Sequence, residues 1–210
     1  MAQTDAATTT STRSMTSGGV GVGVWIFRVL LVAGAAFMVY TWFQPWWSAD
    51  VAVIKGDADM VLHPWGVDAV ARVRNNMDES AFQMPFPQVF AGFMWVYLAV
   101  CMLLLAASIF VTRRIKLGPI NVSVAMLLIL FVGLSYMIAI GLALGIGTVK
   151  AQWAGANFIG KSNVLEPQTG ARLKMTSDLV LGYWLALGAG GVLTFIGLIR
   201  PLFVRKPKVI

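Results

Sequence analysis

Long apolar segments without a single charged residue dominate the pattern of this chain. No Asp, Glu, Lys, Arg or His lies between Phe82 and Thr112, or between Leu117 and Val149, and two further runs cover 179–199 and 29–49. About 20 apolar residues in a helix cross the ~30 Å hydrocarbon layer of a membrane. The pattern therefore predicts four transmembrane helices, at about 20–43, 88–111, 119–148 and 178–200.

Polar residues mark the ends of two predicted spans. Gly118 and Pro119 precede the third span, where proline is tolerated because the first amides of a helix have no partner within it. Thr176, Ser177 and Asp178 are residue types that favour the N-cap of the fourth span, and Pro201 follows its end. These residues predict sharp helix boundaries.

The two longer connections between spans cover 44–87 and 149–177. In the first, Val51–Ile54 and Met60–Leu62 flank a polar turn, which favours a small hairpin. From Asp68 onward apolar residues recur at helical spacing, which predicts a short amphipathic helix on a membrane or partner surface. The second connection shows no clear period. The expected fold class is an all-α membrane protein, a four-transmembrane-helix bundle with a small extracytoplasmic loop region.

The two ends of the chain are polar in different ways. Residues 1–19 are rich in Ala, Thr, Ser and Gly and predict a flexible cytoplasmic N-tail. The glycine-rich run 18–23 leads into a span rather than following a strand, so a flexible entry is favoured over a phosphate loop. Residues 201–210 form a basic tail, expected to be cytoplasmic.

The net charge of +7 is unevenly distributed. Nine Lys or Arg and only one acid lie in the N-tail, at Arg28, in the short middle connection and in the C-tail. Seven Lys or Arg and eight acids lie in the two longer connections, counted together with Asp178. Basic residues beside helix ends predict the cytoplasmic side of a membrane. Both termini are therefore expected on the cytoplasmic side of a prokaryotic cytoplasmic membrane. Their placement beside spans favours lipid contact over nucleic acid.

Few residues in the chain are suited to catalysis or metal binding. His63 is the one histidine, and with Asp57 and Asp59 it forms a weak candidate set of metal ligands; a hydrogen-bonded loop histidine is the simpler interpretation. Cys101, the one cysteine, lies within a span and is expected to serve packing. Since a nucleophile with its base is lacking, we expect no catalytic activity, no cofactor and no soluble substrate.

Small and aromatic residues are the more informative candidates. Small residues four apart let helices approach closely, either spans three and four or a helix of another protein. Tryptophans near the end of span one and in the first connection are typical of an interfacial belt, and ligand binding is the alternative. The helix-packing candidates are Gly133, Gly141, Gly145, Gly182, Ala186 and Gly190, and the belt candidates are Trp42, Trp46, Trp47 and Trp65.

Four spans, a long first connection with strand-forming segments and a tryptophan-rich exit from span one resemble the tetraspan arrangement of claudin-type proteins. The paired cysteines of their first loop have no counterpart between residues 44 and 87. The resemblance therefore implies architecture only, and no residue role or partner.

The sequence favours a non-catalytic structural or accessory subunit of a larger membrane complex, whose partners are other integral membrane subunits and the lipid bilayer. The alternative is a small homo-oligomeric transporter or channel, although the spans hold no Asp, Glu, Lys, Arg or His near mid-membrane. A membrane enzyme that uses quinone or a metal is a third class.

Overall fold

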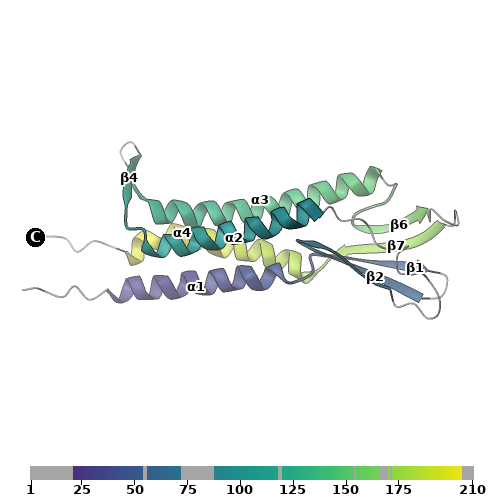
Figure 1. Ribbon diagram of the computed structural model, residues 1–210, viewed down its shortest axis with the longest axis horizontal. Coiled ribbons are helices and arrows are strands. Elements are labelled where there is room, and N and C mark those ends of the chain that lie inside the picture. The colour runs from purple at the N-terminus through teal and green to yellow at the C-terminus, as the bar shows by residue number, and fades with distance from the viewer. Residues whose placement is uncertain are drawn as a thin grey trace, which may run out of the picture.

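The computed structural model describes residues 21–53, 56–71, 88–117, 120–153, 155–165, 170 and 172–204. Within this part, four helices are long and apolar enough to cross a membrane. A helical bundle runs along the long axis of the molecule, and a β-sheet extends beyond one end of it (Figure 1). The helices are α1 (Val22–Trp42), α2 (Gln88–Phe110), α3 (Val124–Trp153) and α4 (Leu181–Phe203).

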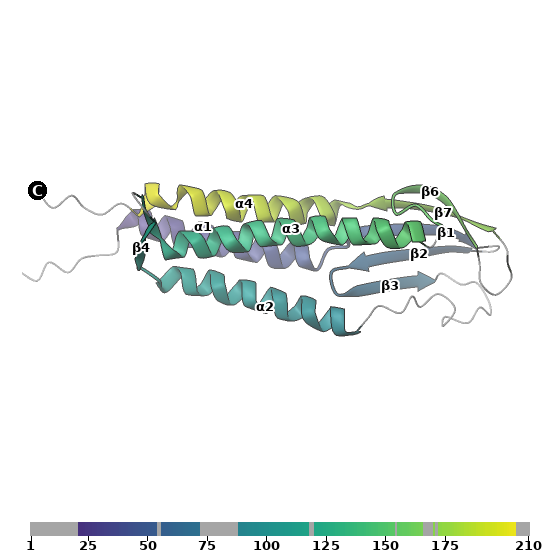
Figure 2. The same ribbon diagram turned by 90° about the horizontal axis from the view of Figure 1, so that it is seen from above.

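The bundle is organised around α4, which packs between α1 and α3, while α2 lies mainly along α3 (Figure 2). Phe27, Leu31, Ile129 and Leu193 belong to its buried interior. Large apolar side chains also cover the outside of the bundle; Leu103, for example, is 69% exposed. A bundle that is apolar both inside and outside is suited to lipid as its solvent. The structure thus confirms a membrane-integral four-helix bundle.

A five-stranded antiparallel sheet makes the expected all-α class incomplete. Its order is β3-β2-β1-β7-β6, so that strands from both long connections share one sheet. The pairing of β1 with β7 joins them, with Trp47 opposite Leu179 and Val51 opposite Met175. The strands are β1 (Trp47–Val53), β2 (Gly56–His63), β3 (Gly66–Ala71), β6 (Gly160–Leu165) and β7 (Arg172–Leu179).

The first connection contains the expected hairpin and one more strand. Strands β1 and β2 pair from Trp47 opposite Leu62 to Val53 opposite Gly56. Strand β3 then occupies the first positions of the predicted amphipathic helix, with Val67 opposite Leu62. The helical spacing was misleading there because pairing with β2 satisfies the backbone of 66–71. The rest of that predicted helix, as far as Met77, lies outside the described residues.

The second connection has strands where no period was recognised. In β7, buried Leu173, Met175 and Ser177 alternate with exposed residues, as expected of a strand with one covered face. Ser177 therefore lies in β7 rather than at the N-cap of the fourth span. Helix α4 begins at Leu181, and its N-cap, Val180, makes no side-chain capping bond.

The middle connection forms a second, two-stranded sheet at the opposite end of the bundle. Strand β4 (Arg114–Leu117) pairs with β5 (Ile120–Ser123), and Arg114 lies opposite Ser123. This hairpin delays the start of α3 to Val124, five residues after Pro119, which lies outside the described residues. Pro201 lies inside the last turn of α4.

Candidate functional site

The junction between bundle and sheet is organised by Trp46. Its backbone amide donates to the carbonyl oxygen of Leu62 at 2.8 Å, and its carbonyl oxygen accepts from the amide of Val180 at 3.2 Å. Its indole Nε1 donates to the carbonyl oxygen of Thr41 at 3.2 Å. One residue thus connects α1, strand β2 and the start of α4, and this fixes where the sheet stands on the bundle.

Aromatic rings continue from this junction into the bundle. We call Trp42, Phe43, Trp46, His63, Trp65, Trp95 and Tyr136 the junction cluster. The imidazole of His63 stacks on Trp65 at 4.9 Å between centroids, and Trp65 stacks on Trp95 at 5.3 Å. Trp42 lies 6.3 Å from Trp95 and 6.4 Å from Tyr136. Rings from β2, the turn after it and three helices therefore form one continuous contact.

The inner end of the junction cluster holds polar atoms. The Thr41 hydroxyl donates to the carbonyl oxygen of Met38 at 2.9 Å and lies 3.3 Å from the Tyr136 hydroxyl. Nearby, the hydroxyls of Tyr97 and Ser135 are 3.0 Å apart. Apart from Trp42, whose indole nitrogen is buried without a hydrogen-bond partner, these groups satisfy one another, which is the arrangement of a structural network rather than of a reactive site.

The tryptophans expected in the interfacial belt point mostly inward. Trp42 is fully buried and Trp46 is 4% exposed, while Trp47 and Trp65 are largely covered. At the same end of the bundle, large exposed rings belong instead to Tyr40, Phe43 and Trp184. Sequence reasoning missed Phe43 and Trp184 because ring type alone does not distinguish a lipid-facing position from one facing a neighbouring helix.

The weak ligand candidates lie along β2. Asp57 pairs with Ala52 and Asp59 with Asp50, while His63 ends the strand. His63 lies four residue steps after Asp59 along the strand, which is about 13 Å. Among the described residues, no group of three or more His, Cys, Asp or Glu could hold a metal ion.

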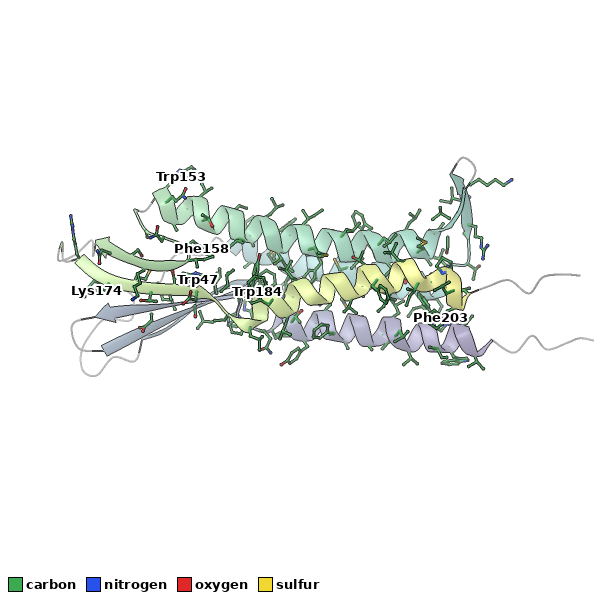
Figure 3. The ribbon with its side chains drawn as sticks, turned by 180° about the vertical axis from the view of Figure 1, so that it is seen from behind. Trp47, Trp153, Phe158, Lys174, Trp184 and Phe203 are labelled. Carbon is green, nitrogen blue, oxygen red and sulfur yellow. The ribbon has the colours of Figure 1, made fainter. Side chains whose placement is uncertain are left out.

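A smaller apolar cluster joins the sheet to the end of α3. Trp47 stacks on Phe158 with ring centroids 5.1 Å apart, and its indole donates to the Phe158 carbonyl oxygen at 2.6 Å (Figure 3). The Ser177 hydroxyl donates to that same carbonyl oxygen at 3.0 Å. On the helix side, a Cβ added to Gly147 would come within 2.6 Å of the Phe158 ring. Phe158 thus fills the space between sheet and helix.

Helix α3 continues well past the start of α4. Gly133 lies against Gly190, so the antiparallel helices place residue 142 level with Leu181. The eleven residues that follow extend about 16 Å further at 1.5 Å per residue. We call this segment, 143–153, the α3 overhang; Figure 3 shows its last residue, Trp153, far beyond Trp184 of α4.

The outer side of the α3 overhang carries three exposed apolar residues together with the exposed Lys150. Ile146 is 52% exposed, Val149 44% and Trp153 83%. Their spacing of three and four residues places them on one side of the helix. The sequence contained a signal for this feature, since the charge-free run of 117–149 is longer than a membrane requires.

The six helix-packing candidates occupy two kinds of environment. Gly133, Gly182, Ala186 and Gly190 are buried between elements, and a Cβ on Gly182 would collide with the carbonyl oxygen of Pro45. A Cβ on Gly141 or Gly145 would meet nothing within 4 Å. The four buried candidates therefore pack against neighbouring elements of this chain. Gly141 and Gly145 lie on a face of α3 that no other described element of this chain covers.

Comparison with known proteins provides no family for the chain: no family model matches it, and no curated protein matches its sequence.

Proposed function

We propose that this chain is a non-catalytic accessory subunit of a larger integral membrane complex, and that it binds its partner through the α3 overhang. The observation that carries the proposal is the exposed apolar side of that segment. Helix α4 has 23 residues, about 33 Å from its first Cα to its last, which matches the hydrocarbon layer. An overhang of about 16 Å exceeds the remaining headgroup layer of roughly 5–7 Å.

Exposed apolar side chains beyond the headgroup layer contact water unless another protein covers them. Ile146, Val149 and Trp153 together form a contiguous strip, and such strips outside the hydrocarbon are typical of protein interfaces. Tryptophan is also among the residues that most often dominate binding energy at interfaces. We therefore assign Trp153 as the main contact, with an apolar surface of a second integral membrane subunit as its partner.

The proposed orientation places the overhang and the five-stranded sheet outside the cytoplasm of a prokaryotic cell. Its support is the distribution of charge over the described residues. The five described aspartates lie in β1, β2, β3 and β7, whereas the other end of the bundle carries Arg28, Arg113, Arg114, Lys116 and Arg200. By the positive-inside tendency, the hairpin β4–β5 and both termini face the cytoplasm.

The test is co-purification from native membranes in mild detergent. A tagged chain carrying Val149→Ser and Trp153→Ser is compared with the tagged wild type, and co-eluting chains are quantified by mass spectrometry. Loss of a central tryptophan contact costs about 2 kcal/mol or more, which corresponds to a loss of roughly 30-fold in affinity. We expect the recovered partner to fall by at least tenfold.

Ile159→Ser is the matched control, because Ile159 is 47% exposed beside the sheet but lies outside the overhang. It should leave partner recovery at the wild-type level. Equal recovery with the overhang variant and the control would contradict the proposed interface.

A further inference from the structure

The end of the bundle that carries β4 and β5 contains an unusual group of cations. The Nη1 atom of Arg200, in the last turn of α4, donates to the Ser123 hydroxyl of β5. Ser123 lies opposite Arg114 in the β4–β5 ladder, and the charge of Arg114 acts repulsively on Arg200. The guanidinium of Arg200 therefore bonds the Ser123 hydroxyl, and a second positive charge, that of Arg114, lies nearby on the paired strand.

The Arg200 guanidinium is only partly satisfied by the described residues. Its carbon lies over the Phe27 ring, 5.6 Å from the centroid, while its Nε is buried and has no hydrogen-bond partner. The described aspartates all belong to strands of the five-stranded sheet, at the opposite end of the molecule. Two like charges held together without a carboxylate among the described residues are unfavourable unless an anion joins them.

A third cation lies at the same level of the bundle. Arg28 directly follows Phe27, the residue that packs under Arg200, and its Nε is likewise buried without a hydrogen-bond partner. Its guanidinium carbon lies 5.8 Å from the centroid of the Trp25 ring. Arg28 therefore strengthens the positive potential around this end of α1 and α4 without forming an ion pair within the described residues.

We propose that Arg200, Arg114 and Ser123 form a binding site for a phosphate group, with Arg28 as a flanking charge. Guanidinium groups present N–H donors in a planar fork that fits phosphate oxygens. The Ser123 hydroxyl accepts from Arg200 and keeps its own hydrogen to donate. Arg200 lies about one turn before the end of α4, so its long side chain can reach the level of the lipid phosphates when the helix spans the hydrocarbon. An anionic lipid headgroup and a free phosphate ion both offer this chemistry.

The experiment measures lipid retention on the intact chain by native mass spectrometry, after reconstitution in nanodiscs with equal phosphatidylglycerol and phosphatidylcholine. We expect phosphatidylglycerol to be retained in preference on the wild type. Loss of one charge-assisted contact should reduce that preference about tenfold in Arg114→Gln, and further in Arg114→Gln with Arg200→Gln. Lys174→Gln, an exposed position on β7 at the other end, is the control and should match the wild type.

Free phosphate is tested separately, by ³¹P line broadening of inorganic phosphate with the chain in phosphatidylcholine nanodiscs. If the phosphate line is broadened by the wild type but not by Arg114→Gln, the site binds free phosphate. If phosphatidylglycerol is retained selectively and the phosphate line is not broadened, the site binds a lipid headgroup. Either result supports the site. If Arg200→Gln fails to fold, Arg114→Gln alone decides, because Arg114 is exposed. The proposal is overturned if lipid retention is the same in wild type, variants and control and no broadening occurs.

Discussion

Gly133 of α3 and Gly190 of α4 lie against each other where the two helices pack. A Cβ on Gly133 would come within 2.9 Å of the Gly190 carbonyl oxygen, and a Cβ on Gly190 within 3.1 Å of the Gly133 carbonyl oxygen. These distances are too short for ordinary contacts to backbone atoms. The pair therefore sets the distance between the two helices. It also sets their register, and with this register the α3 overhang extends beyond the start of α4.

Gly133→Ala should destabilise the bundle by about 1–3 kcal/mol, because the added methyl group meets the backbone of Thr194 and Gly190 as well as the Thr194 hydroxyl. Gly141→Ala is the matched control, since its methyl group would meet nothing within 4 Å and alanine is the better helix former. Denaturant unfolding in detergent, followed by circular dichroism, measures both. Equal stability of the two variants would contradict the packing described.

Two tryptophans of the junction cluster differ in one hydrogen bond. The Trp46 indole donates to Thr41, whereas the Trp42 indole is buried without a partner. Both substitutions to phenylalanine leave a smaller ring in a buried site. Trp46→Phe should cost about 1 kcal/mol more than Trp42→Phe, the net value of one hydrogen bond. Unfolding free energies of the two single variants test this difference, and the reverse order would refute it.

Two serines of the sheet provide a similar comparison. Ser177 is 1% exposed and its hydroxyl bonds to the Phe158 carbonyl oxygen at 3.0 Å, while the buried Ser162 hydroxyl has no hydrogen-bond partner. Ser177→Ala should lower the free energy of unfolding by about 1–2 kcal/mol, and Ser162→Ala should be neutral or stabilising. Hydrogen exchange of amides in 155–165 should rise only in the Ser177 variant; a rise in both would argue against the assigned bond.

The proposed orientation can be tested with introduced cysteines. Lys174→Cys on β7 should react with a membrane-impermeant maleimide added to intact cells, and Arg114→Cys on β4 should react only after lysis. The native Cys101 is 2% exposed within the bundle, so the unmodified chain should remain unlabelled and serves as the background control. The opposite labelling pattern would reverse the orientation.

The four helices could be predicted from the sequence because lipid imposes a minimum length of apolar chain, and the runs of uncharged residues meet it directly. Helix ends were less predictable. The start of α3 depends on the hairpin β4–β5, and α4 begins after β7 rather than at the polar residues Thr176 to Asp178. Strand pairing over a long sequence separation decided both boundaries, and local residue preferences do not report such pairing.

The sheet itself illustrates the same limit. The hairpin β1–β2 is local and was visible as two apolar segments around a polar turn. The pairing of β1 with β7 joins residues more than 120 positions apart, and nothing in either segment alone indicates the other. Likewise Trp95 and Tyr136 were recognised as parts of spans, but their contacts with Trp42 depend on how three helices pack.

The mass of the intact assembly released from native membranes tests the subunit proposal most directly. Native mass spectrometry of the tagged chain, purified without crosslinking, should give an assembly that contains this 22.7 kDa chain together with at least one different membrane polypeptide. A species at the mass of the single chain, or only at whole multiples of it, would contradict the account.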